Sequence, residues 1–158
     1  MYLFEKDGMC CGGLDYSENL IRGAKKVLSS TDLLCAEADQ MPEQPLYDAV
    51  LSNSVFSYFG DTEYAERVLE KMYRKARYSI GVIDIHDKDK ERDFLEYRKK
   101  ILDNYEERYK DLPKLFYEKD FFGRFAEKYG MNVVFTDSCV KGYWNNEFVF
   151  NCYMYKQS

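Results

Sequence analysis

The stretch Met9-Cys-Cys-Gly-Gly-Leu-Asp-Tyr-Ser17 contains the junction from which the fold can be predicted. A short apolar run ends at Asp15, and Ser17 is of a residue type that commonly caps helices. Apolar residues then recur at helical spacing, at Leu20, Ile21, Ala24, Val27 and Leu28. The pattern predicts a strand that ends at Asp15 and leads at once into an amphipathic helix.

The same alternation continues toward the C-terminus. Further strands are expected at residues 32–36, 47–51, 78–85, 131–135 and 147–155, and helices within 87–111 and at 120–129. Another helix is expected after a cap at Asp61 or Thr62, with one apolar stripe formed by Tyr64, Ala65, Val68, Leu69 and Met72. Alternating strands and helices predict a parallel sheet with helices on both faces. The turn-rich link at 142–146 favours an antiparallel pairing of the last two strands. We therefore expect one α/β domain over residues 1–158, Rossmann-like, with a mostly parallel sheet and an antiparallel C-terminal strand.

Composition and charge exclude several classes of protein. A chain of 158 residues with 46% hydrophobic residues can bury a core without disulfide staples. The net charge of −5 argues against a nucleic-acid partner, because phosphate binding needs surplus cations. No apolar run approaches the roughly 20 residues of a membrane span, and residues 1–8 lack the pattern of a secretory signal. The five cysteines show no zinc-site spacing, so reduced thiols, a cytoplasmic location and no metal are expected.

Polar residues follow the first three predicted strands, where ligands bind in parallel sheets. The Asp15 carboxylate can accept hydrogen bonds from ribose hydroxyls, although an Asp at this position can also simply cap the helix. Glu37 can accept from an adenine amino group and the Ala38 N–H can donate to a ring nitrogen, unless this loop is only solvated. The small polar pair Ser52-Asn53 suits close approach by a ligand, or else forms an ordinary turn.

Three segments together, in this order and spacing, resemble the class I S-adenosylmethionine-dependent methyltransferases of the small-molecule type. They are Gly13-Leu-Asp-Tyr-Ser17, Ala36-Glu-Ala-Asp-Gln-Met-Pro42 and Tyr47-Asp-Ala-Val-Leu-Ser-Asn-Ser54. The resemblance implies S-adenosylmethionine as cofactor, with its ribose on Asp15 and its adenine against Tyr16. It places Glu37 and Ala38 at the adenine edge, or Asp39 if the register slips by two. It implies that Ser52 and Asn53 face the methionine part.

The N-terminal residues of the chain differ from the pattern of this family. Family members begin with a strand that ends in a glycine-rich turn, whereas residues 1–8 here look like the end of the helix that follows that turn. Gly12 and Gly13 do not replace the turn, because they fall within the predicted strand that carries Asp15. Without the missing strand two interior strand edges are unpaired. The chain is then a fragment, or re-pairs its sheet within one chain or as a homodimer, or uses a substitute strand.

His86 and Asp84 are the candidate catalytic residues. His86 is the single histidine and follows the strand at 78–85, where with a pKa of about 6.5 it could take a proton from an acceptor. Asp84 and Asp87 would orient the ring, and the alternative is a surface histidine in a charged loop. Aromatic residues are expected to line the acceptor pocket, namely Tyr58, Phe59, Tyr117, Tyr143 and Trp144. Residues 87–111 are expected to form a solvated helix.

The expected function is methyl transfer to a small-molecule acceptor, which loss of the glycine-rich loop would weaken or abolish. The alternative is a non-catalytic, methyltransferase-like relic or interaction module. A nicotinamide-dependent oxidoreductase is disfavoured, since it also needs a glycine fingerprint that the sequence does not show.

Overall fold

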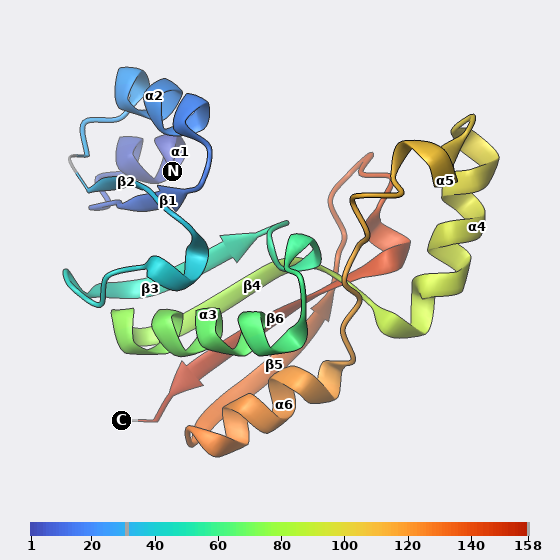
Figure 1. Ribbon diagram of the computed structural model, residues 1–158. Helices are drawn as coiled ribbons and strands as arrows, with labels where there is room; N and C mark the ends of the chain where they lie inside the picture. Colours follow the sequence, from blue (N-terminus) through green and yellow to red (C-terminus); the bar gives the residue numbers. More distant parts are fainter. Residues whose placement is uncertain (31, 158) are drawn as a thin grey trace. The chain divides into compact units, whose positions relative to one another are not determined.

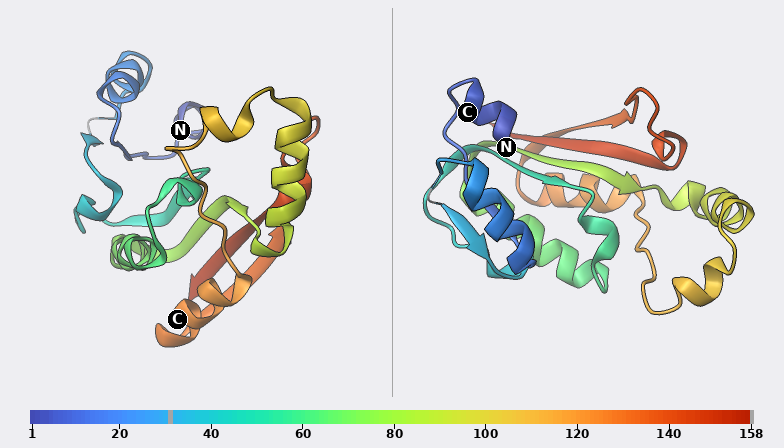
Figure 2. Two further views of the ribbon diagram at one scale, coloured as in Figure 1. Left: turned by 45° about the vertical axis from the view of Figure 1, so that its right-hand side comes forward. Right: turned by 90° about the horizontal axis from the view of Figure 1, so that it is seen from above.

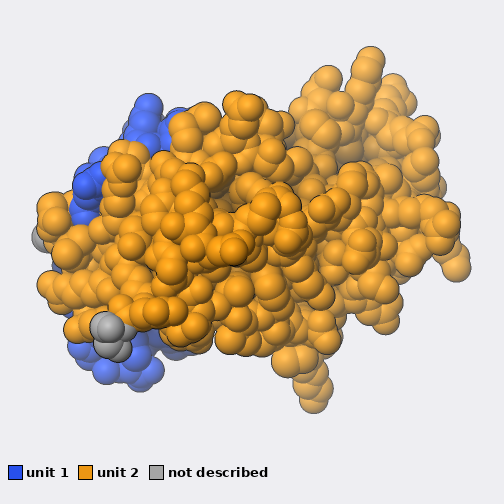
Figure 3. Space-filling model, turned by 90° about the horizontal axis from the view of Figure 1, so that it is seen from below, with its two compact units in different colours: residues 1–43 blue, residues 44–158 orange. Residues whose placement is uncertain are grey.

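The computed structural model describes residues 1–30 and 32–157 (Figure 1). The chain divides into two compact units, residues 1–43 and residues 44–158, which Figure 3 shows in different colours. The described strands form a two-stranded sheet, β1-β2, and a four-stranded sheet, β3-β4-β6-β5. The single sheet expected from the sequence is thus divided into two hydrogen-bonded parts.

The first unit alternates helices and strands. Its elements are α1 (Tyr2–Lys6), β1 (Gly13–Asp15), α2 (Glu18–Val27) and β2 (Leu33–Cys35). β1 and β2 pair in parallel, with Asp15 opposite Cys35. The Ser17 side chain accepts a hydrogen bond from the backbone of Leu20, so it caps α2 as predicted. The strand begins at Gly13 rather than Met9, because only residues 13–15 pair with β2.

The second unit contains the larger sheet and the remaining helices. Its strands are β3 (Tyr47–Asn53), β4 (Ala76–His86), β5 (Met131–Asp137) and β6 (Val149–Lys156), and its helices are α3 (Thr62–Lys75), α4 (Glu91–Ile101), α5 (Tyr105–Arg108) and α6 (Lys119–Lys128). β3 pairs with β4 in parallel, and β6 is antiparallel to both β4 and β5. Three strands therefore run in one direction and the C-terminal strand runs against them, which confirms the predicted fold class.

The core of the second unit lies under α3 and α6, which cover the same face of this sheet (Figures 1 and 2). The cross-strand pairs Ile80–Met154 and Val82–Cys152 point into it, and each of these side chains is at most 1% exposed. The predicted stripe of α3 faces the same core and is buried at Ala65, Val68, Leu69 and Met72. Full burial of such side chains contributes about 1.5–3 kcal/mol each, so this layer holds α3 against β3 and β4.

The segment predicted as one solvated helix over 87–111 is two helices. α4 ends at Ile101, and Asn104 takes a left-handed conformation with φ of 56° before α5 begins. Asparagine adopts this conformation more readily than most residues, which explains the break. α4 is also not fully solvated, since Phe94 is buried against Phe116 and Phe148.

Two glycines of the α6 region give opposite expectations for the same substitution. Gly130 follows α6 with φ of 61°, so Gly130→Ala should lower the free energy of unfolding by about 1 kcal/mol. Gly123 lies inside α6 with open space where a Cβ would be, so Gly123→Ala should raise it by about 0.5–1 kcal/mol. Urea unfolding of both variants tests this, and equal shifts would contradict the assignment of the helix end.

Candidate functional site at the ends of β3 and β4

The candidate site begins where two parallel strands end side by side. Asn53, the last residue of β3, is opposite Ile83 of β4, and the residue that follows each of them has a left-handed backbone. Ser54 has φ of 58° and Asp84 has φ of 62°. Each such residue costs about 1 kcal/mol or more relative to glycine, so their side chains must be held by surrounding contacts.

The Asp84 carboxylate is the centre of these contacts. Its Oδ2 accepts hydrogen bonds from the Ser54 hydroxyl at 2.5 Å and from the Tyr143 hydroxyl at 2.8 Å. Its Oδ1 accepts from the Asn145 amide at 3.4 Å, and its backbone N–H donates to Asn151 Oδ1 at 3.0 Å. Asp84 is 9% exposed, so both oxygens of a largely buried carboxylate are already occupied by neutral donors.

His86 lies beside this network in an apolar setting. The residue is 5% exposed, and its ring packs against Phe94 and Phe116, with ring centroids 4.7 and 5.3 Å away. The Asn145 side-chain nitrogen is 3.2 Å from His86 Nε2. Because the same nitrogen also faces the Asp84 carboxylate, it donates, and we assign the ring proton to Nδ1. Nδ1 has no hydrogen-bond partner among the described residues.

His86 is not a surface histidine, and its pKa is not the ordinary value of about 6.5, so both of these expectations are wrong. Burial, followed by the positive charge of Lys114, lowers the pKa of His86 to about 4. The ring is therefore neutral at pH 7. Its hydrogen-bond partner is Asn145 rather than Asp84 or Asp87, since Asp87 accepts instead from the backbone of Asp89.

A lysine that the sequence did not indicate lies next to the network. Lys114 Nζ is 3.0 Å from the centroid of the Tyr58 ring, and the chain is anchored here by the Leu115 N–H, which donates to the Ser57 carbonyl at 2.9 Å. Burial lowers the pKa of Lys114 to about 8, while Asp84 opposes this shift. The ammonium is thus partly desolvated, but with this pKa it stays mostly protonated at pH 7.

In the first unit, Asp15 and Tyr16 lie next to the end of β2. Asp15 Oδ1 accepts from the Ser17 N–H at 2.8 Å, so the carboxylate also helps to begin α2. Cys35 Sγ lies 3.5 Å from the Tyr16 carbonyl, and the Tyr16 side chain is 77% exposed. Glu37 is exposed, and a short 3-10 helix, Ala38–Gln40, follows it. Ser52 and Asn53, the other predicted cofactor residues, belong to β3 of the second unit.

The aromatic residues predicted to line the acceptor pocket lie in different settings. Tyr117 is 1% exposed and donates to the Phe56 carbonyl at 2.8 Å, so it belongs to the core. Tyr143 reaches Asp84, whereas Trp144 stacks on Tyr97 with centroids 5.8 Å apart. Asn145 and Lys114 were missed, because a lone asparagine in a turn and a lone lysine after a proline carry no sequence signal.

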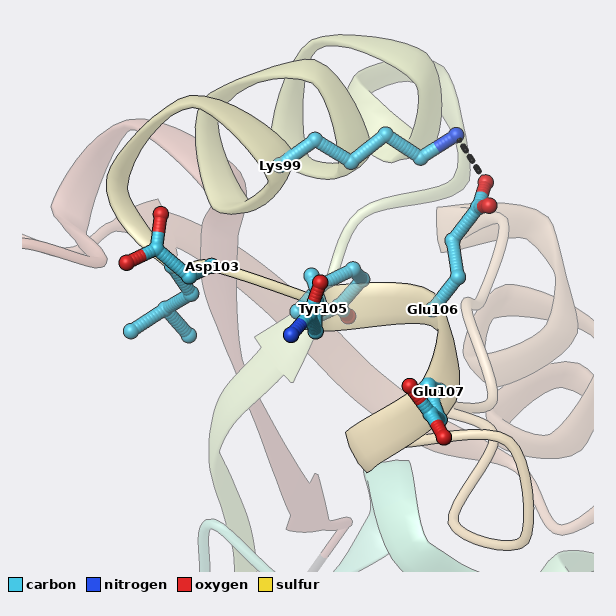
Figure 4. A pocket seen from close by; sticks show the side chains of 7 residues that line it. Lys99, Asp103, Tyr105, Glu106 and Glu107 are labelled. Atoms are coloured by element: carbon cyan, nitrogen blue, oxygen red, sulfur yellow. Dashed lines mark ion pairs between the residues drawn. The ribbon is translucent and has the colours of Figure 1, made fainter.

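A separate hollow of about 420 Å³ lies between α4 and α5 (Figure 4). Polar side chains line much of it, and Lys99 and Glu106 form an ion pair of 2.6 Å across it. Lys99 and Glu106 are both well exposed, so this pair contributes little to stability. The hollow contains none of the predicted site residues.

Three further findings concern metals, thiols and membranes. Among the residues that the structure describes, no three His, Cys, Asp or Glu side chains are grouped to hold a metal ion. The five cysteines are free thiols. No helix within residues 1–30 and 32–157 has the length and apolar character needed to cross a bilayer.

Residues 2–78 match a protein-family model that is described as a methyltransferase domain. Solved methyltransferases have the same fold. The chain has the fold of the class I methyltransferases. Residues 2–78 match the methyltransferase-domain model by sequence, so the resemblance drawn from the strand-end motifs is confirmed. A search of curated proteins found no match.

Three methyltransferase structures illustrate the similarity. Magnesium protoporphyrin IX methyltransferase from Synechocystis PCC 6803 is 13% identical with a TM-score of 0.62, covering 92% of this chain and 63% of its own. The plantazolicin methyltransferase BpumL is 16% identical with a TM-score of 0.70, and the match covers 99% of this chain and 71% of BpumL. N-methyltransferase NodS from Bradyrhizobium japonicum WM9 is 10% identical with a TM-score of 0.61, and the match covers 92% of this chain and 65% of NodS. The chain thus spans less than two thirds of the first and the third of these.

Proposed function

We propose that the protein transfers a methyl group from S-adenosylmethionine to a small-molecule acceptor. The observation that carries this proposal is the polar network at the paired ends of β3 and β4, in a chain whose residues 2–78 match a methyltransferase domain. The three similar methyltransferases were each crystallised with S-adenosylhomocysteine, which supports the choice of cofactor.

The residues at the end of β1 fit the nucleoside part of this cofactor. Asp15 uses Oδ1 to accept from Ser17, while no described protein group donates to its Oδ2, which suits a ribose hydroxyl. The exposed Tyr16 ring offers a surface for adenine, and Glu37, Ala38 and Asp39 would bind its edge. Ser52 and Asn53 would approach the methionine part. The cofactor, when bound, would supply a methyl group already activated on a sulfonium.

The residues at the ends of β3 and β4 would position the acceptor. Asp84 and His86 were candidates for proton transfer, but Asn145 already donates to both, and Ser54 and Tyr143 donate to Asp84. We therefore assign Asp84 and His86 to holding Tyr143 and Asn145 in place. Correct placement of the reacting groups is a large contribution that a protein can make to such a displacement.

Calorimetric titration with S-adenosylhomocysteine tests the cofactor site. The isosteric change Asp15→Asn keeps an oxygen for the Ser17 N–H but removes the anionic acceptor for ribose, so affinity should fall at least about tenfold. Asp7→Asn, on an exposed residue of the same unit, is the matched control and should bind like the wild type.

The absence of binding heat at millimolar ligand would refute the proposed enzyme. It would favour the alternative, a non-catalytic methyltransferase-like module. A homodimer through open strand edges stays a prediction, motivated by β1 pairing only with β2, and β3 only with β4, among the described residues. We also expect a cytoplasmic setting, because free thiols persist in reducing compartments.

A further inference from the structure

A second hollow, of about 250 Å³, lies in the second unit between α4, α5 and residues 109–116. Its apolar wall consists of Leu95, Tyr105, Tyr109, Leu112, Pro113 and Phe116. Lys114 also lines it, and Phe116 packs directly against His86 of the strand-end network. The volume is close to the lower end of small-molecule sites, roughly 300–1,000 Å³, and suits a compound with one aromatic ring.

The two acidic residues of this hollow are already neutralised. Glu91 forms an ion pair with Lys88 at 2.6 Å, and Glu106 forms one with Lys99 at 2.6 Å. Each glutamate therefore has its own cation. Neither glutamate is therefore free to pair with Arg98 or Lys114.

The two cations nearest the network lack such partners. The Arg98 guanidinium lies over the rings of Tyr105 and Tyr109 and donates to the Tyr109 hydroxyl at 3.2 Å. Within the described part of the chain, neither Arg98 nor Lys114 has a carboxylate at ion-pairing distance. Repulsion from Arg98 adds to burial in lowering the pKa of Lys114.

The remaining groups around Lys114 do not remove this imbalance. Asp84 attracts the ammonium and offsets one of the two cations, because Ser54, Tyr143 and Asn145 are neutral donors that leave its charge in place. One positive charge remains in excess. His86 is neutral at pH 7 because burial lowers its pKa to about 4. The hollow therefore combines an aromatic wall with an excess of positive charge, at a position that is partly shielded from water. An anion bound there would gain charge-assisted contacts and relieve the repulsion between the two cations.

We propose that this hollow binds a small planar aromatic compound carrying an oxygen anion, a phenolate or a carboxylate. The anion lies beside Lys114, and the ring packs against Phe116 and Tyr109. That the bound compound is the methyl acceptor rests on the proposed function, whereas its binding in the hollow does not.

The test uses para-nitrophenol, whose phenolate absorbs visible light and whose neutral form does not. At a pH about one unit below its pKa in water, adding the wild-type protein should increase the phenolate absorption, since a nearby cation favours the ionised form. Benzoate should displace the probe, whereas the uncharged isostere benzamide should not. Displacement by both would show that the ring alone is recognised and would overturn the proposal.

Three variants assign the effect to one side chain. Lys114→Met should weaken probe binding at least about tenfold, and Lys114→Arg should retain it because the charge is kept. Lys110→Met, on an exposed lysine that lines neither hollow, is the matched control and should bind like the wild type. Circular dichroism establishes that each variant is folded. If Lys114→Met cannot be folded, the wild-type spectrum and the Lys114→Arg variant still decide the matter.

Two results would refute the inference: no phenolate absorption with wild-type protein, or equal binding by wild type and Lys114→Met. The proposed function fails in a different experiment, through the absence of S-adenosylhomocysteine binding. Probe binding that depends on Lys114 without any cofactor binding would therefore support the site while refuting the methyltransferase.

Discussion

Replacing Asp84 by alanine should lower the free energy of unfolding of the second unit by about 3 kcal/mol, since three hydrogen-bond donors lose their acceptor and each loss costs about 1 kcal/mol or more. The substitution removes the acceptor for Ser54, Tyr143 and Asn145 at once. Three donors, one of them on the buried Asn145, then lose a hydrogen bond that water cannot fully replace. The change also leaves a β-carbon in a left-handed backbone with φ of 62°.

Comparison with Asp84→Gly separates the network from the backbone strain. Glycine loses the same hydrogen bonds but accepts a positive φ, so it should be about 1 kcal/mol less destabilising than alanine. The matched control is Asp48→Ala, which breaks only the exposed 3.3 Å pair with Arg77 and should change stability by at most about 0.5 kcal/mol.

Urea unfolding followed by the fluorescence of Trp144 measures these effects, because this single tryptophan neighbours Tyr143. An Asp84→Ala variant as stable as Asp48→Ala would show that the network contributes nothing.

Stability should also fall as the solution is acidified from pH 7.5 to pH 5, by about 2 kcal/mol from His86 alone. Burial lowers the pKa of His86 in the folded chain to about 4 from an ordinary value of 6.5. Below pH 6.5 the imidazole therefore binds a proton in the unfolded chain but not in the folded chain, and this shifts the equilibrium toward unfolding. The stabilisation is complete above pH 6.5 and is lost as the pH falls toward 4.

Unfolding of His86→Gln is the direct comparison, since glutamine keeps a hydrogen-bond acceptor and removes the titrating ring. The variant should show a much flatter profile between pH 7.5 and 5, because His86 is the only histidine in the chain. For the same reason, one imidazole resonance in the proton NMR spectrum follows the folded state directly. A resonance that titrates near pH 6.5 in folded protein would contradict the buried, neutral ring.

Local sequence patterns predicted the elements well where burial is periodic. The stripe of α3 and its Asp61 cap, the end of α6 before Gly130, and the antiparallel final strands were all recognisable. The break at Asn104 was not, since the helical spacing of apolar residues continues past it. Periodicity reports which face is buried and says little about where a backbone leaves the helix.

The sequence by itself determined the class of fold and the polar residues at the strand ends, because hydrophobic periodicity and short motifs are local properties of the chain. Only the tertiary structure decided what those residues do. Asn145 is about 60 residues away from Asp84 and His86 along the chain, yet it fixes the tautomer of one and occupies the carboxylate of the other. Protonation and hydrogen bonding depend on burial and on partners distant in sequence, which no local pattern records.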